Sequence, residues 1–405
     1  MLASGSIFCV LVCWIPNLEP QNLESEPRTE NLAPSTAVSG TSVASSTGMK
    51  PRLKPLSEQI VVITGASSGI GLTTAEMAGQ AGARVILASR NEAELLEAVS
   101  RIRGNGGRAF YIVADVADPD AVDAIADLAI EQFGGIDTWV NNAGVGMYGK
   151  LTDTPLADKR RLFDVDFWGV VHGCRTAVRH LRAGGGAIVN VGSVTSDRAV
   201  PLLGIYSAAK HAVKGYTEAL RMELEHEGIP ISVSLVKPAS INTPMIEHAR
   251  SHMESEPEYM PPVYPPEEAA RAILKCAERP IRDVLVGGAA RFLSSVGRMA
   301  PRTMDAYLEA TAFQQQKRGK RNDHIDALDR PQRDGQRRGP TTRYTMRRSA
   351  YTRVTTSRAG RVLPLLAVSA LAAGLAFGLP RPPVRRSAQR RGESADGRRE
   401  NGGIE

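Results

Sequence analysis

Between residues 59 and 286 the sequence alternates short apolar runs rich in β-branched residues with longer segments that have the period of a helix. Strands are predicted at 60–64, 84–89, 109–114, 138–141, 187–192, 231–236 and 283–286. Helices are predicted at 72–81, 92–103 and 121–133, within 155–181, and at 206–226 and 266–278. Strands joined through helices pair in parallel by right-handed crossovers, and helices then cover both faces of the sheet. We therefore expect an α/β fold with a doubly wound parallel sheet.

A glycine-rich turn separates the first predicted strand from the first helix. It reads Thr-Gly-Ala-Ser-Ser-Gly-Ile-Gly over residues 64–71. Glycine lets the chain turn tightly and lets backbone N–H groups at a helix N-terminus approach a phosphate. Such a turn is typical of a Rossmann-like nucleotide-binding domain. The residues expected to hold the cofactor here are Gly65, Ser67, Ser68, Gly69, Ile70 and Gly71.

Tyr206 and Lys210 are four residues apart on a predicted helix, and Ser193 lies 13 residues before Tyr206. Residues at i and i+4 share one helix face, so the ammonium of Lys210 can lie beside the hydroxyl of Tyr206. A nearby cation favours the phenolate and lowers the pKa of tyrosine from its ordinary value of about 10. Tyr206 is therefore a candidate general acid or base.

These motifs, together with Asn141-Asn142-Ala143-Gly144 and in this order, resemble the short-chain dehydrogenase/reductases. The resemblance covers roughly residues 56–288. It implies hydride transfer between a nicotinamide dinucleotide and a carbonyl or secondary alcohol, with Tyr206 as proton donor. Ser193 would hydrogen-bond the substrate oxygen, and Lys210 would also bind the nicotinamide ribose. Further cofactor contacts are implied for Asp115, Val116, Asn142, Ala143, Gly144, Tyr206, Lys210, Pro238 and Thr243.

The end of the second predicted strand bears on the choice between NAD and NADP. Enzymes that prefer NAD place a carboxylate there, which accepts hydrogen bonds from the ribose 2′-hydroxyl. This chain has Ser89 and Arg90 instead. Because a guanidinium can bind a 2′-phosphate through two parallel hydrogen bonds, NADP (NADPH) is expected rather than NAD.

Asp166 departs from the resembled pattern. The family has an Asn on the long helix that helps a water relay protons to the lysine, whereas this chain reads Val-Asp-Phe-Trp-Gly over residues 165–169. Asp has nearly the shape of Asn, but when ionised it only accepts hydrogen bonds. We expect Asp166 to act as the fourth catalytic residue and to tolerate exchange for Asn. The alternative is a site adapted to the charge, in which the carboxylate helps keep Lys210 protonated and exchange for Asn lowers activity.

The segment 244–265 is expected to contact the substrate. It contains Met245, Met253, Tyr259, Met260, Pro261, Pro262 and Tyr264. Flexible thioethers and aromatic rings suit an adaptable apolar pocket, although ordinary loop packing explains them equally well. The expected partner is a small carbonyl or alcohol substrate of lipophilic character.

The nucleotide-binding domain is assigned to residues 56–300, and the composition of the chain differs on either side of it. Residues 1–55 are expected to be a disordered or misassigned extension, 301–316 an accessory helix and 317–361 a basic linker. Residues 362–380 are a candidate transmembrane helix, whose uncharged core 363–379 would span about 25 Å at roughly 1.5 Å per residue. Residues 381–405 form a basic disordered tail. The predicted location is a membrane, with the catalytic domain facing the cytoplasm; a soluble cytoplasmic protein is the alternative.

The charge distribution and the cysteine content argue against most other functional classes of protein. The 21 Lys and Arg residues within 317–405 face only 8 Asp and Glu, so the chain's net charge of +7 belongs to its C-terminal part. The alternative function is a catalytically weak nucleotide-binding scaffold whose basic tail binds polyanions or membrane, but the tail has no recognisable nucleic-acid module. The 4 cysteines have no metal-ligand spacing. Self-association into a homo-oligomer stays open.

Overall fold

The computed structural model describes residues 51–321, 326–332, 335–341 and 343–356. Its centre is a sheet of 7 strands in the order β10-β7-β6-β4-β1-β2-β3, with every neighbouring pair parallel. The strands are β1 (Ile60–Thr64), β2 (Arg84–Ser89), β3 (Arg108–Val113), β4 (Thr138–Asn141), β6 (Gly186–Val191), β7 (Ile231–Pro238) and β10 (Asp283–Val286). The strand order reverses between β1 and β4, which is where such sheets bind their ligands. The predicted doubly wound fold is confirmed.

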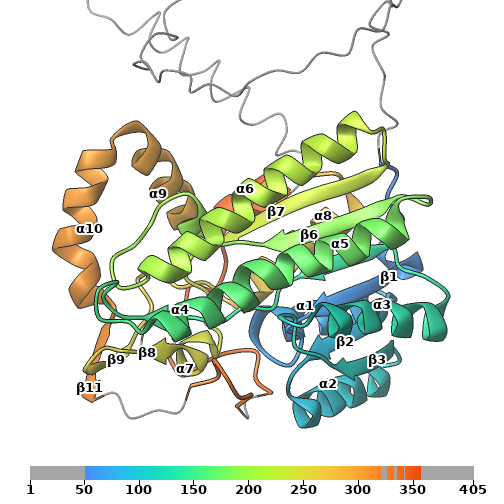
Figure 1. The fold of residues 1–405 in the computed structure, drawn as a ribbon, viewed down its shortest axis with the longest axis horizontal. Helices are drawn as coiled ribbons and strands as arrows, with labels where there is room; N and C mark the ends of the chain where they lie inside the picture. The colour runs from blue at the N-terminus through green and yellow to red at the C-terminus, as the bar shows by residue number, and fades with distance from the viewer. Residues whose placement is uncertain (1–50, 322–325, 333–334, 342, 357–405) are drawn as a thin grey trace, which may run out of the picture. The chain divides into compact units, whose positions relative to one another are not determined.

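Helices cover both faces of this sheet, and in Figure 1 α5 and α6 cross in front of it. One face buries apolar side chains of α1 (Gly69–Gln80), α2 (Glu92–Gly104) and α8 (Pro266–Glu278). The other face packs against α3 (Pro119–Phe133), α5 (Gly169–Leu181) and α6 (Gly204–His226). Because both faces are covered, β1, β6 and β7 are buried at every position rather than at alternate ones.

The helix expected within 155–181 is interrupted. It consists of α4 (Leu156–Phe163), a π-helical turn, η2 (Asp164–Trp168), and α5. A π turn shifts the residues that follow relative to the α-helical register and occurs frequently at functional sites. Here it contains Asp166, whose side chain is buried.

The chain beyond β10 adds helices α9 (Gly288–Met299) and α10 (Pro301–Gln315); an accessory helix was expected at 301–316. The segment expected to be a linker then packs against the domain, shown in orange in Figure 1. Leu328 is fully buried there and Thr352 is 1% exposed. The remaining short elements are η1 (Leu56–Glu58), β5 (Met147–Tyr148), η3 (Val194–Ser196), α7 (Met245–His248), β8 (Arg250–Ser251), β9 (Ser255–Pro257), β11 (Lys317–Arg321) and α11 (Ala350–Thr356).

Two predicted regions lie outside the described residues: the N-terminal extension up to residue 50, and the apolar stretch 363–379 with the tail behind it. In the described part of the chain, no helix combines the length and the apolar character needed to cross a bilayer.

Candidate active site

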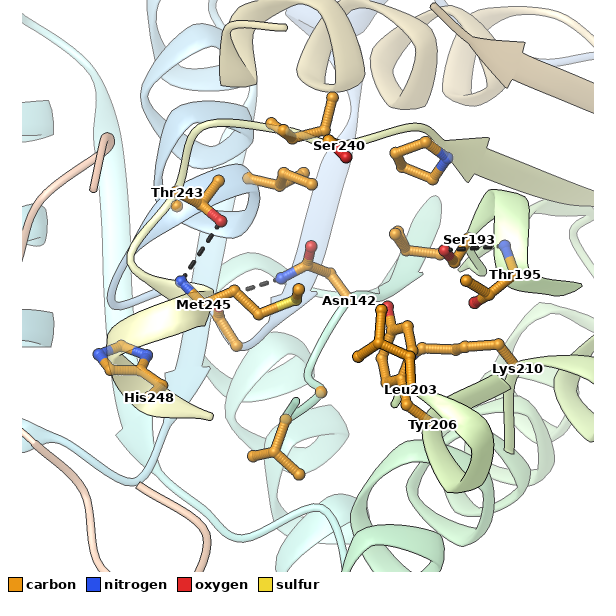
Figure 2. Close-up of a pocket in the computed structure, with 18 of the residues that line it drawn as sticks. Asn142, Ser193, Thr195, Leu203, Tyr206, Lys210, Ser240, Thr243, Met245 and His248 are labelled. Atoms are coloured by element: carbon orange, nitrogen blue, oxygen red, sulfur yellow. Dashed lines mark hydrogen bonds between the residues drawn. The ribbon is translucent and has the colours of Figure 1, made fainter. Parts of the chain in front are cut away.

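A cavity of about 350 Å³ lies at the carboxyl edge of the sheet, beyond the ends of β1, β2, β4, β6 and β7 (Figure 2). Of the site residues predicted from the sequence, those that line it are Gly65, Ser67, Ser68, Gly69, Ile70, Ser89, Arg90, Asp115, Val116, Asn142, Ala143, Gly144, Ser193, Tyr206, Lys210, Pro238 and Thr243. Gly71 and Asp166 do not line the cavity. Gly71 packs against Gly65, and Asp166 forms an ion pair with Lys210. Residues that are more than 100 positions apart in the sequence therefore meet at one cavity.

The glycine turn is fixed by close packing against the end of β4. Gly65 has a φ of +63°, which favours glycine, and a Cβ atom at Gly71 would lie 2.1 Å from the carbonyl oxygen of Gly65. Asn142 Nδ2 donates to the carbonyl oxygens of Thr64 and Gly65, each at 3.0 Å. These contacts hold the N-terminus of α1 toward the cavity, as anion binding requires.

Ser193 caps the N-terminus of η3, two residues after the end of β6. Its Oγ accepts a hydrogen bond from the backbone N–H of Thr195 at 3.1 Å, and its own N–H donates to Ser196 Oγ at 3.1 Å. This reciprocal capping box fixes the position of the hydroxyl at the cavity wall. Figure 2 shows Ser193, Tyr206 and Lys210 around the same space.

Tyr206 is 7% exposed and lies in the first turn of α6. Burial raises the pKa of its hydroxyl and Asp166 raises it further, while Lys210 and a hydrogen bond with Ser193 lower it; the net change is upward. The sequence predicted a net decrease, because it could show the cation but not the burial. A phenol with a raised pKa stays protonated at neutral pH and is a weaker acid than a free tyrosine, so proton donation depends on Lys210 stabilising the phenolate.

Lys210 forms a buried ion pair with Asp166, with 3.0 Å between Nζ and Oδ2. Asp166 Oδ1 also accepts from the backbone N–H of Val145 at 2.7 Å. Burial lowers the pKa of Lys210, but the Asp166 carboxylate outweighs it and the pKa is raised. A Cβ atom at Gly144 would lie 3.3 Å from Lys210 Nζ, so the small residue lets the chain pass close to the pair.

Arg90 has partners that the sequence did not predict. Its guanidinium donates to the backbone carbonyls of Ala327 and Leu328, the latter at 3.0 Å, and lies 3.9 Å from Asp115. Arg161 also forms an ion pair with Asp115. No local signal in the sequence links β2 to residues 327 and 328, because such contacts between distant segments arise only in the folded chain.

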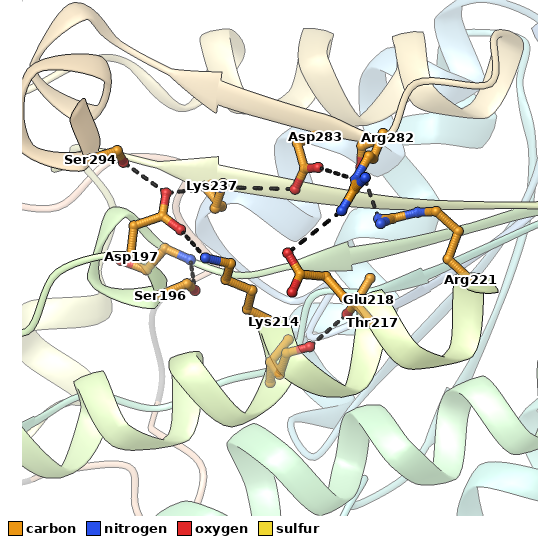
Figure 3. Close-up of polar contacts among 12 residues, drawn as sticks. Ser196, Asp197, Lys214, Thr217, Glu218, Arg221, Lys237, Arg282, Asp283 and Ser294 are labelled. Carbon is orange, nitrogen blue, oxygen red and sulfur yellow. Dashed lines mark hydrogen bonds and ion pairs between the residues drawn. The ribbon is translucent and has the colours of Figure 1, made fainter. Parts of the chain in front are cut away.

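A second polar cluster, centred on Asp197, lies behind the Ser193 loop (Figure 3). Its carboxylate accepts from Lys214 Nζ, Lys237 Nζ and Ser294 Oγ, each at 2.8 Å. Burial raises the pKa of Asp197, but the lysine and serine contacts outweigh it and lower the pKa to about 2. The cluster joins η3, α6, β7 and α9, and it was not predicted from the sequence.

Much of the cavity wall outside the predicted cofactor contacts is apolar. Of the candidate substrate residues, Met245, Tyr259, Met260, Pro261 and Pro262 line the cavity, whereas Met253 and Tyr264 do not. Segments not assigned to the site add Val200, Leu203, Phe292, Leu293, Tyr307 and the polar Gln316, and the expected substrate segment adds the polar Glu258. Phe292 is 54% exposed and Tyr307 46% exposed, which places both at the mouth of the cavity.

Comparison with known proteins agrees with this geometry. The model of the family described as short chain dehydrogenase matches residues 59–254. An uncharacterized oxidoreductase, YxnA, from Bacillus subtilis is 45% identical over 270 residues, covering 66% of this chain and 76% of that protein. A 3beta-hydroxysteroid dehydrogenase from Mediterraneibacter gnavus is 34% identical over 199 residues, covering 49% of this chain and 71% of that protein.

Among solved structures, a short chain dehydrogenase/reductase from Burkholderia phymatum in complex with NAD aligns with a TM-score of 0.55. It is 27% identical, and the alignment covers 68% of this chain and all of that chain. The chain belongs to the short chain dehydrogenase family of oxidoreductases. Members of this family bind a nicotinamide dinucleotide. The surroundings of Arg90 are relevant to the choice of dinucleotide, and the surroundings of Tyr206 are relevant to the choice of substrate.

Proposed function

We propose that this protein transfers hydride between NADP(H) and a carbonyl or secondary alcohol of lipophilic character. The observation that carries the proposal is the convergence of Ser193, Tyr206 and Lys210 on the cavity into which the glycine turn also faces. The close packing at Gly65 and Gly71 and the N-terminus of α1 fit a dinucleotide pyrophosphate. When bound, the dinucleotide supplies or accepts the hydride.

Residues of the protein itself donate and accept the proton. In reduction, Tyr206 donates its proton to the substrate oxygen, and the hydroxyl of Ser193 hydrogen-bonds that oxygen as negative charge develops. Lys210, kept charged by Asp166, stabilises the phenolate that Tyr206 becomes. In oxidation the same groups act in the opposite sense, and Tyr206 accepts the proton.

Arg90 supports NADP over NAD. It lies at the cavity beyond β2, where a carboxylate would be needed to accept from a free 2′-hydroxyl. Each of its Nη atoms carries two hydrogens, and the contacts with Ala327 and Leu328 use one on each. A 2′-phosphate would bind the remaining hydrogens or take the place of these two carbonyls.

The apolar wall supports a lipophilic substrate. Methionine, proline and aromatic side chains from several separate segments face the space beside Tyr206. The name of the Mediterraneibacter gnavus relative, a 3beta-hydroxysteroid dehydrogenase, is consistent with a substrate of this kind.

A direct test is to follow absorbance of NADPH and of NADH with a panel of ketones and aldehydes graded from polar to lipophilic. We expect turnover with NADPH, with kcat/KM rising with the apolar size of the substrate, and no turnover by Tyr206→Phe. Equal kcat/KM values with NADH would contradict the cofactor assignment. Absence of turnover across the panel and in the reverse direction with secondary alcohols would contradict the reaction.

A further inference from the structure

The C-terminal segment enters the dinucleotide half of the cavity. We call the described residues 326–332 and 335–341 the strap. Ala327, Pro331 and Gln332 of the strap line the cavity beside Arg90. They come from a region outside the span matched by the family model, which ends at residue 254. A role for the strap in dinucleotide binding rests on the proposed function.

Backbone carbonyls of the strap take up the hydrogen-bond donors expected to bind the dinucleotide. Gly69 N–H, at the N-terminus of α1, donates to the carbonyl oxygen of Gln336 at 2.9 Å. Arg90 donates to two further strap carbonyls, and Asn91 Nδ2 donates to that of Gln332 at 2.8 Å. The single hydrogen of the Gly69 amide cannot serve a phosphate while it serves Gln336.

The strap is held by ion pairs and by buried apolar contacts of Ala327 and Leu328. Arg250 donates to both carboxylate oxygens of Asp326 at 3.0 Å and to Asp329 at 2.8 Å. Arg338 pairs with Glu267 at 2.9 Å. Asp329 is 58% exposed and Arg338 57% exposed, and exposed pairs of this kind are individually weak. These ion pairs are the contacts at which substitutions can loosen the strap without changing its buried apolar residues.

We propose that the strap is a competitor, built into the chain, for the phosphate groups of the dinucleotide. Its carbonyls occupy Gly69 and Arg90 in the free protein and leave them when the cofactor binds. The apparent Kd for the dinucleotide is then the intrinsic Kd divided by the fraction of molecules in which the strap has withdrawn. Loosening the strap should tighten binding.

Two variants loosen the strap while changing the local charge in opposite directions. Asp326→Asn/Asp329→Asn removes two negative charges, and the amide oxygen introduced at position 326 can still accept from Leu328 N–H as the carboxylate of Asp326 does. Arg250→Gln removes the positive partner, and Asp158 keeps its contact with His252 at 3.0 Å. A direct effect of charge on NADPH would tighten binding in the first variant and weaken it in the second.

The measurement is the Kd of NADPH by fluorescence titration, with the thermal midpoint of each variant as a check of folding. We expect both variants to bind at least about threefold more tightly than wild type. The charge-matched controls, Asp120→Asn/Asp127→Asn on α3 and Arg302→Gln on α10, should bind like wild type.

Tightening in one loosened variant and weakening in the other would show a charge effect and overturn the proposal. Weakening in both would make the strap a wall of the binding site, and unchanged Kd values would make it irrelevant; either result overturns competition and leaves the proposed function standing. If neither wild type nor any variant binds NADPH or NADH, the proposed function itself fails.

A second readout uses wild-type protein without turnover. Arg338, which is followed by Gly339 and is 57% exposed, is a trypsin site in the strap. Saturating NADPH should speed cleavage after Arg338 if the cofactor displaces the strap, compared with the same protein without cofactor. Protection of Arg338 by NADPH would mean that the strap closes over the cofactor, and would refute competition.

Discussion

Lys210 Nζ lies 3.0 Å from Asp166 Oδ2, and the two side chains are 5% and 0% exposed. The pair joins α6, the helix that contains Tyr206, to the π turn η2, at a position where the sequence departs from its family's pattern. Removing one partner of a buried ion pair leaves the other charge without compensation, which is costly. The structure therefore argues against the tolerance that the similar shapes of Asp and Asn predicted.

Asp166→Asn should lower kcat at least about tenfold, a loss of roughly 1.4 kcal/mol of transition-state stabilisation. The carboxylate raises the pKa of both Lys210 and Tyr206, so its removal should move the basic limb of the pH profile to lower pH. The check is kcat against pH for both proteins, with NADPH affinity measured in parallel. Equal or higher kcat in the variant would favour the original expectation.

Tyr206→Phe should reduce kcat by about a hundredfold or more, the usual contribution of a positioned general acid. Only the hydroxyl is lost, so the Kd for NADPH should stay within about twofold of wild type. Steady-state kinetics and a binding titration give both values. Retention of more than about a tenth of kcat would mean that Tyr206 is not the proton donor.

Arg90→Asp should shift cofactor preference from NADP toward NAD, because a carboxylate repels a 2′-phosphate and accepts from a 2′-hydroxyl. We expect the ratio of kcat/KM for NADPH to that for NADH to fall at least about tenfold. Arg302→Asp, an exposed substitution of the same kind on α10, is the control and should leave the ratio unchanged.

Ser294→Ala should raise the KM for substrate about threefold to tenfold, with kcat within about twofold of wild type. The change removes the hydrogen bond from Ser294 to Asp197 and so loosens α9, whose Phe292 and Leu293 line the cavity. Ser295→Ala, the next residue of the same helix, removes an identical hydroxyl for which the structure gives no such contact. Equal KM values for the two variants would show that the hydrogen bond between Ser294 and Asp197 does not position the cavity-lining residues of α9.

Asp197 should stabilise the fold in a manner that depends on pH. Its pKa falls from 3.8 to about 2 on folding. Such a carboxylate stabilises above its unfolded pKa, and the effect disappears as the pH falls through the folded value. At pH 6 the free energy of unfolding of Asp197→Asn should be lower than that of wild type by roughly 2 kcal/mol, and the gap should close between about pH 4 and pH 2. Urea unfolding, with Asp127→Asn as control, measures the gap.

The order of strands and helices could be predicted from the sequence, and so could the meeting of Ser193, Tyr206 and Lys210 at one cavity. β1, β2, β4 and β10 begin and end at the predicted residues, because β-branched runs bounded by turn residues are local signals. The glycine turn and the pair Tyr206 and Lys210 were equally readable, since their spacing fixes a turn or a helix face wherever they occur.

The environments of these groups emerged only when the chain was folded. Burial reversed the expected net change in the pKa of Tyr206, and a segment more than 230 residues away supplied partners for Arg90. The clustering of Asp197 with Lys214, Lys237 and Ser294, and the return of the strap to the cavity, were likewise invisible in the sequence. Desolvation and contacts between distant segments depend on which surfaces the folded chain brings together, and no local pattern encodes them.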